Sequence, residues 1–170
     1  MVAVSLQKIA GTGPPFVQFT SGGTVTSPSN LTLPTSLSVL YGSVLDVGST
    51  ALTITGNLSW NNGGYIRMTN GAGTLLVTGD LYANYVGRGD AILTAGVLEV
   101  KGNFSTGGNN YQNYRATGAH ITRFSGTGAQ SIAFVYPQTD KSQFANLEVT
   151  GGGTLSVNTG VIVAGTMTVT

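Results

Sequence analysis

Hydrophobic and polar residues alternate along much of the chain, and one alternating segment of seven residues occurs three times. The copies span residues 52–58, 75–81 and 98–104. The fifth position of each copy is a glycine, namely Gly56, Gly79 and Gly102, so consecutive copies lie 79 − 56 = 23 and 102 − 79 = 23 residues apart. A fixed interval of this length is typical of a repeat protein, in which each repeat is one unit of secondary structure.

The first, third and seventh positions of each copy are large and apolar, whereas the positions between them are mostly Thr, Glu and Lys. The apolar residues are Leu52, Ile54, Leu58, Leu75, Val77, Leu81, Leu98, Val100 and Phe104. Because successive side chains of a strand point to opposite faces, each copy predicts a strand with one buried face. The glycine, followed by Asn or Asp, predicts a bend that needs either a positive φ or a close approach of two backbones.

A unit of this size cannot bury its own apolar face, but units stacked at the spacing of paired strands share one interior. We therefore expect an all-β fold, a single-stranded right-handed parallel β-helix, or β-solenoid, of about seven coils of roughly 23 residues. In this stack Ile54, Val77 and Val100 lie above one another in one internal column. Nothing in the pattern predicts a helix.

The repeat is regular only between residues 45 and 106, and this irregularity suggests a division of the chain. Residues 1–36 hold four of the five prolines and are predicted to form an N-terminal cap or an irregular first coil. Residues 37–170 are predicted to form the solenoid, with a longer-looped insertion at about 107–144. These expectations describe one solenoid domain with an irregular start.

The last residues of the chain alternate like a strand and end in Met-Thr-Val-Thr. A strand at the end of a stack exposes unpaired backbone groups and readily pairs with another molecule. Either the chain is truncated there, or this edge meets another molecule; in the second case we predict a self-association edge formed by Val161, Val163, Met167 and Val169.

Composition narrows the possible partners. Seven Lys and Arg and six Asp and Glu leave a formal net charge of +1, which does not favour binding to nucleic acid. No apolar run approaches the roughly 18 residues of a membrane span, and the N-terminus lacks the pattern of a signal peptide. We expect either a protein that stays inside the cell or a piece of a longer secreted one. The absence of cysteine excludes disulfides and thiolate metal sites.

Four segments occur in a characteristic order within residues 96–149, a span of about a third of the chain. They are GVLEVKGNF at 96–104, ATGAH at 116–120, FSGTGAQSI at 124–132 and SQFANLEV at 142–149. This order resembles a segment of large repetitive bacterial surface and secreted proteins, the adhesin-like β-solenoids. The resemblance implies an exported structural segment, at the cell surface or outside the cell, without a catalytic role. It transfers no functional residue to this chain.

The ionisable residues predict neither a catalytic site nor a metal or cofactor site. Polysaccharide-cleaving solenoids need at least two carboxylates on one face, and the six carboxylates here are scattered. Asp80 occupies the turn position of Asn57 and Asn103, so we expect it to bind backbone. His120 is the only histidine, which excludes a two-histidine metal site and favours a hydrogen-bonded turn residue. We therefore expect no enzyme activity.

Aromatic residues are the candidates for ligand binding. The rings of Trp60, Tyr82, Tyr85, Tyr111 and Tyr114 lie in or beside segments that follow a repeat glycine. Rings with a polar group suit glycan stacking or a protein contact, particularly if Trp60 and Tyr82 share an exposed face. The alternative is that these rings pack inside the solenoid or against a loop.

Two further patterns have ordinary explanations. Arg88-Gly89-Asp90 matches a tripeptide that integrins bind, but in a glycine-rich chain we expect a simple turn. Outward threonines such as Thr53, Thr55 and Thr78 resemble the hydroxyl ladders of ice-binding solenoids, but Leu76, Glu99 and Lys101 interrupt them.

Together these observations favour a structural stalk or passenger segment of a bacterial cell-surface or extracellular protein, acting in adhesion or self-assembly. Its expected partners are itself or neighbouring repeats, end to end, with glycans or host and cell-surface proteins as further candidates. Three alternatives stay open: a carbohydrate-binding module, a polysaccharide-active β-helix enzyme and a phage virion structural protein.

Overall fold

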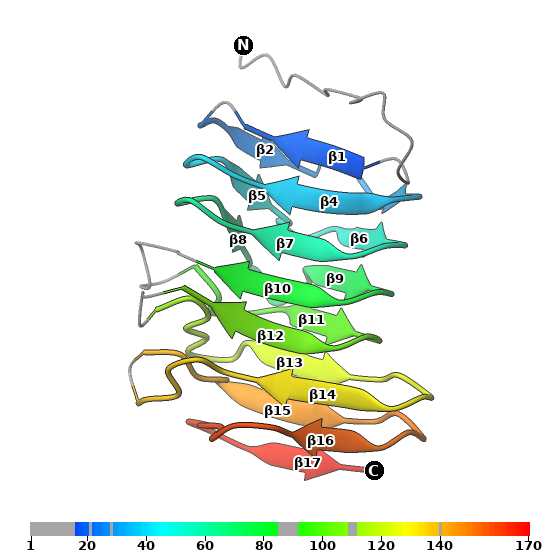
Figure 1. The fold of residues 1–170 in the computed structure, drawn as a ribbon. Helices are drawn as coiled ribbons and strands as arrows, with labels where there is room; N and C mark the ends of the chain where they lie inside the picture. The colour runs from blue at the N-terminus through cyan, green and yellow to red at the C-terminus, as the bar shows by residue number, and fades with distance from the viewer. Residues whose placement is uncertain (1–15, 21, 28, 85–91, 109–111, 140) are drawn as a thin grey trace.

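The computed structural model describes residues 16–20, 22–27, 29–84, 92–108, 112–139 and 141–170. These residues form a parallel β-solenoid of about six turns, in which the chain winds from the first strand to the last along one axis (Figure 1). The described residues contain seventeen strands and no helix, which confirms the predicted all-β class.

Three parallel sheets run along the solenoid. Sheet A contains β1 (Phe16–Phe19), β4 (Ser36–Val39), β7 (Leu58–Trp60), β10 (Leu81–Asn84), β12 (Phe104–Gly107), β14 (Gln130–Ala133) and β16 (Leu155–Val157). Sheet B contains β2 (Thr24–Thr26), β5 (Val44–Asp46) and β8 (Tyr65–Arg67). Sheet C contains β3 (Leu31–Leu33), β6 (Ala51–Ile54), β9 (Thr74–Val77), β11 (Val97–Val100), β13 (Ile121–Phe124), β15 (Asn146–Val149) and β17 (Met167–Val169).

The predicted internal column exists. Ile54 pairs with Val77 in the β6–β9 register, and Val77 pairs with Val100 in the β9–β11 register. All three side chains are fully buried. Stacking identical positions in this way lets each coil bury the apolar face of its neighbour, which is why the repeat folds as a solenoid.

Coil length varies around the predicted 23 residues. Leu81 to Phe104 is a coil of 104 − 81 = 23, whereas Phe16 to Ser36 is 36 − 16 = 20 and Phe104 to Ile132 is 132 − 104 = 28. The number of turns is therefore about six and not the seven that a constant period predicts, because residues 1–15 lie outside the described part and the later coils are longer than 23 residues.

Glycine is required at the repeat positions because the backbones of successive coils approach each other closely there, and not because the backbone has a positive φ. A Cβ built on Gly79 would lie 2.8 Å from the carbonyl oxygen of Gly56, and one on Gly102 would lie 2.5 Å from that of Gly79. None of the three has a positive φ. Each coil therefore rests on the backbone of the previous coil at this corner, where only glycine leaves room.

Large rings fill the interior of the later coils. They are Trp60, Phe104, Tyr114, Phe124, Phe134 and Phe144, all fully or almost fully buried. The centroids of Phe104 and Tyr114 are 4.9 Å apart with the rings edge to face, and those of Phe134 and Phe144 are 5.0 Å apart. Burial of each ring stabilises the fold by roughly 2 kcal/mol, and edge-to-face contacts add to this.

Candidate functional site

The structure places two of the predicted ligand-binding rings inside the solenoid. Trp60 lies two residues after Leu58 on β7, so strand alternation turns it inward with that leucine. Its ring stacks on Tyr114, with centroids 6.0 Å apart and planes inclined by 21°. Trp60 and Tyr114 are both buried, so the prediction that they contact a ligand at the surface is wrong. Their burial agrees with the alternative that the rings pack inside.

Of the remaining aromatic candidates, Tyr82 is the one that the structure describes. It points outward from β10, in register with Ser59 and Ser105, and its side chain is 39% exposed. It does not share a face with the buried Trp60. Tyr85 and Tyr111 lie outside the described residues, as does the Arg88-Gly89-Asp90 tripeptide.

His120 lies in the interior and joins a chain of polar contacts. Its Nδ1 donates to the carbonyl oxygen of Ala95 at 2.9 Å, so in the neutral ring Nε2 is an acceptor. The Tyr114 hydroxyl lies 3.3 Å from Nε2 and donates to it, and the Thr122 hydroxyl lies 2.7 Å from that of Tyr114 and donates in turn. The side chains of His120, Tyr114 and Thr122 are all buried, and these contacts satisfy their polar atoms.

Burial controls the protonation of this cluster. Loss of hydration lowers the pKa of His120 to about 4, although the hydrogen bond to Ala95 opposes this shift. Burial also raises the pKa of Tyr114 above its usual range, while the Thr122 hydrogen bond acts in the opposite direction. Both groups are neutral at pH 7 and enclosed. The prediction of a hydrogen-bonded histidine is confirmed, but the residue lies in the core.

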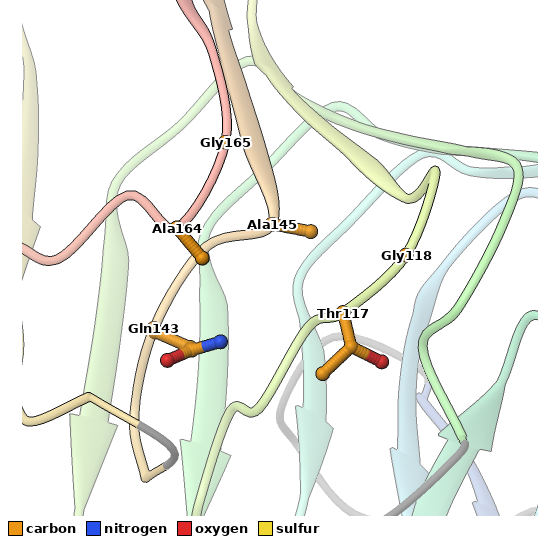
Figure 2. Close-up of a pocket in the computed structure, with 6 residues that line it drawn as sticks. All are labelled: Thr117, Gly118, Gln143, Ala145, Ala164 and Gly165. Atoms are coloured by element: carbon orange, nitrogen blue, oxygen red, sulfur yellow. The ribbon is translucent and has the colours of Figure 1, made fainter.

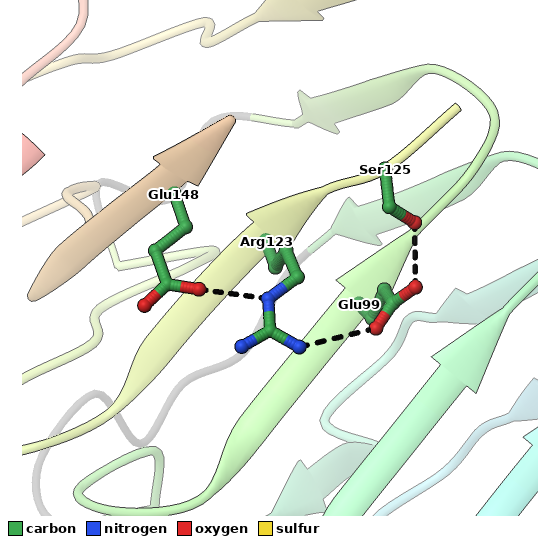
Figure 3. A network of polar contacts seen from close by, with 4 residues as sticks. All are labelled: Glu99, Arg123, Ser125 and Glu148. Atoms are coloured by element: carbon green, nitrogen blue, oxygen red, sulfur yellow. Dashed lines mark hydrogen bonds and ion pairs between the residues drawn. The ribbon is translucent and has the colours of Figure 1, made fainter. Parts of the chain in front are cut away.

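A charged column crosses the outer face of sheet C (Figure 3). Glu99, Arg123 and Glu148 pair in register on β11, β13 and β15. Arg123 Nε donates to Glu148 at 2.7 Å, and its Nη1 lies 3.4 Å from Glu99. The Ser125 hydroxyl donates to the other oxygen of Glu99 at 2.5 Å. The Glu148 hydrogen bond, despite partial burial, raises the pKa of Arg123 above its ordinary value.

The column brings Glu99 and Glu148 to the same arginine, although the six carboxylates were predicted to be scattered. Both carboxylates bind the same guanidinium, that of Arg123. The arrangement joins three successive coils through side chains.

A second ladder of side chains lies where the chain enters sheet A. The Asn57 side chain accepts the backbone N–H of Asp80 at 2.8 Å, and the Asp80 side chain accepts that of Asn103 at 2.7 Å. Asn103 accepts the N–H of Ser131 at 2.9 Å. Asp80 therefore binds backbone as predicted, but the backbone of the next coil and not of its own turn.

Two surface depressions are lined by described residues. One, of about 290 Å³, lies near the end of the solenoid and is lined by Thr117, Gly118, Gln143, Ala145, Ala164 and Gly165 (Figure 2). The other, of about 300 Å³, lies on the outer face of sheet C between the Thr53–Leu76 region and Glu99. In the described residues no three His, Asp or Glu side chains gather as metal ligands would. No helix there is long and apolar enough to cross a membrane.

The last coil exposes residues that belong to internal columns. Val157 pairs in register with buried Ile132, and Met167 pairs with buried Leu147. Val169 pairs with Val149, which is itself only partly buried. Val157, Met167 and Val169 are 55%, 58% and 67% exposed. Val161 and Val163 are partly buried and pack against the core.

Comparison of the chain with models of protein families, with curated proteins and with solved structures finds no match.

Proposed function

We propose that this chain is a structural β-solenoid segment, a stalk or passenger rod of a bacterial cell-surface or extracellular protein, that associates end to end through its last coil. The observation that carries the proposal is the exposure of Val157 and Met167, whose register partners in the preceding coil, Ile132 and Leu147, are buried, together with the exposure of Val169 on the same strand as Met167.

The edge of the last coil lacks the usual protection against pairing. Natural edge strands are blunted by charged residues, by proline or by a bulge. Residues 149–170 contain neither a charged residue nor a proline. The strands β16 and β17 end sheets A and C, and each pairs with one neighbour only. This coil therefore offers apolar side chains and free strand edges to a second copy of the chain.

The solenoid also has the cohesion that a rod requires. Backbone ladders join successive coils in sheets A and C along the whole described stack. The Asn57–Asp80–Asn103 ladder and the Glu99–Arg123–Glu148 column add bonds parallel to the axis. The export and bacterial origin rest on the resemblance of residues 96–149 to repetitive surface proteins.

The association is tested with the 170-residue chain by light scattering and sedimentation over a range of concentrations. We expect the mass to rise with concentration. A double variant, Met167→Lys and Val169→Lys, places charges on the exposed apolar face and should remain monomeric. The control is Thr168→Lys, which adds a charge to the same strand on its outward face and should still associate.

Two results would contradict the proposal. One is a wild-type chain that stays monomeric at every concentration. The other is a Thr168→Lys variant that loses association as completely as the double variant, because the contact would then not involve the internal columns.

A further inference from the structure

The segment before β13 inserts two side chains into the interior. Asn113 and Tyr114 are both almost fully buried. The side-chain amide of Asn113 donates to the carbonyl oxygen of Gly107. The main-chain carbonyl oxygen of Asn113 accepts a hydrogen bond from Trp60 Nε1 at 3.3 Å. Tyr114 stacks on the Trp60 ring and meets Phe144 with centroids 5.6 Å apart. The segment thus closes the aromatic core of the longest coil.

His120 connects this segment to the coils on both sides. Its ring binds the Ala95 carbonyl oxygen in the preceding coil and the Tyr114 hydroxyl in its own coil. Its backbone carbonyl oxygen accepts the N–H of Asn146 in the following coil at 3.2 Å. Removal of the ring from its site therefore loosens Tyr114 directly.

The backbone of residues 112–120 pairs with its neighbours at separate positions and not as a continuous strand. Arg115 and Ala116 form isolated bridges to Gln143 and Leu93, whereas β11 and β13 pair over four positions. The segment is nevertheless tied to both neighbouring coils, since the Ala116 and Thr117 N–H groups donate to the carbonyl oxygens of Gln143 and Leu93 and the Gln143 N–H donates to that of Tyr114. Opening the segment breaks these bonds, but it leaves the longer ladders of sheets A and C intact. A local opening costs less than separating sheet A or sheet C, so it is the expected response to stress within this coil.

We propose that residues 112–120 form an acid-operated latch, in which protonation of the His120 ring releases Asn113 and Tyr114 from the interior while sheets A and C stay paired.

The charges around His120 do not offset a positive ring. Its ring partners are a neutral carbonyl oxygen and a neutral hydroxyl, and the titratable one is Tyr114. Arg115 and Arg123, the nearest charged residues along the chain, carry the same sign as a protonated histidine. The carboxylates of Glu99 and Glu148 lie on the outer face of sheet C and bind Arg123. No negative charge among the described residues of the closed site stabilises a protonated His120 ring, so the charged ring is stabilised only when it is exposed to water.

The direction of the effect follows from linkage. The pKa of His120 is about 4 in the closed site and returns to about 6.5 when the ring is hydrated. The open form therefore binds the proton more tightly. Above pH 6.5 the free-energy difference that favours the closed form has its full value. Between pH 6.5 and pH 4 this difference becomes smaller. At pH 4.5 the ratio of open to closed molecules is about 60-fold higher than at pH 7.

The composition of the chain makes the test direct, because Trp60 is the only tryptophan and His120 the only histidine. The wild-type chain is titrated from pH 7.5 to 3.5 while Trp60 emission, the His120 ring proton resonances and far-ultraviolet circular dichroism are recorded. We expect Trp60 emission to move to the red together with the titration of His120, while the β-sheet signal stays constant.

Two variants distinguish the effect of protonating His120 from the effect of protonating carboxylates. His120→Gln keeps a neutral donor and acceptor and should lose the emission change above pH 4. Glu148→Gln, the matched control, should keep it. The proposal is overturned if wild-type Trp60 emission does not change while His120 titrates, if the sheet signal is lost with it, or if His120→Gln keeps the transition. Should His120→Gln fail to fold, the coincidence of the wild-type signals still decides.

Discussion

A single missing side chain decides how closely two coils approach at the corner before sheet A. The backbone of Gly79 lies against that of Gly56 and against the Asn57 side chain that caps the next coil. Any Cβ there occupies the position of these atoms. The glycine is therefore a packing requirement, and its neighbours cannot yield because they are backbone atoms in two adjacent ladders.

We expect Gly79→Ala to lower the free energy of unfolding by roughly 2 to 4 kcal/mol, because the added methyl group overlaps backbone of the preceding coil. Gly71→Ala is the matched control, since a Cβ at Gly71 has nothing within 4 Å and its φ is not positive. Its effect should stay within about 0.5 kcal/mol. Urea unfolding measures both, and equal losses would contradict the close approach.

At the scale of the element, each strand of sheet C contributes one side chain to the outer column. Arg123 on β13 bridges Glu99 on β11 and Glu148 on β15, and its side chain is 32% exposed. Opposite charges that face each other across strands stabilise a sheet by a few tenths to about 1 kcal/mol per pair, and salt screens them. Removal of the cation leaves two carboxylates in one column.

Arg123→Met should therefore cost about 1 kcal/mol at low salt and less at 1 M NaCl. Lys101→Met is the control, because Lys101 is an exposed cation immediately after β11 and its loss should change stability little. Thermal unfolding at two salt concentrations distinguishes them. An Arg123 variant with no salt dependence would show that the column contributes packing and not charge.

At the scale of the whole molecule, coils in the middle of the stack are covered on both sides and the last coil on one. In a repeat protein stability is a sum of units and interfaces, so the ends open first. The aromatic rings between Trp60 and Phe144 concentrate buried area in the later central coils, whereas β17 has all its residues exposed.

Hydrogen exchange should therefore be slowest for backbone amides of β9 and β11 and fastest, within sheet C, for β17. The measurement is made on the Met167→Lys and Val169→Lys variant, so that association does not protect the edge. Uniform protection across β9, β11 and β17 would instead indicate that the solenoid opens as one unit.

Much of the regular part of the fold could be predicted because one rule, alternation, acts on every coil. It predicted the faces of Leu52, Ile54 and Leu58 and the column through Val77 and Val100. The burial of Trp60 follows from the same rule, since it stands two residues after Leu58, but the polar residues around it suggested an exposed segment.

Tyr114 and His120 could not be placed in this way, because they lie in an aperiodic stretch between β12 and β13. One signal was present: aromatic residues occur at ten-residue intervals from Phe104 to Phe144. All five are buried in the same core. The 23-residue repeat conceals this spacing.

The sequence by itself determined the class of fold, the spacing of the regular coils and the identity of the inward columns, because these depend on local alternation and on a repeat that the chain contains. The tertiary structure decided which side chains meet between coils of unequal length. Glu99 plus 23 is Thr122, which is inward, but the coil is one residue longer and Glu99 faces Arg123. A shift of one residue reverses the face of a strand, so such pairings are fixed only when the coils are closed.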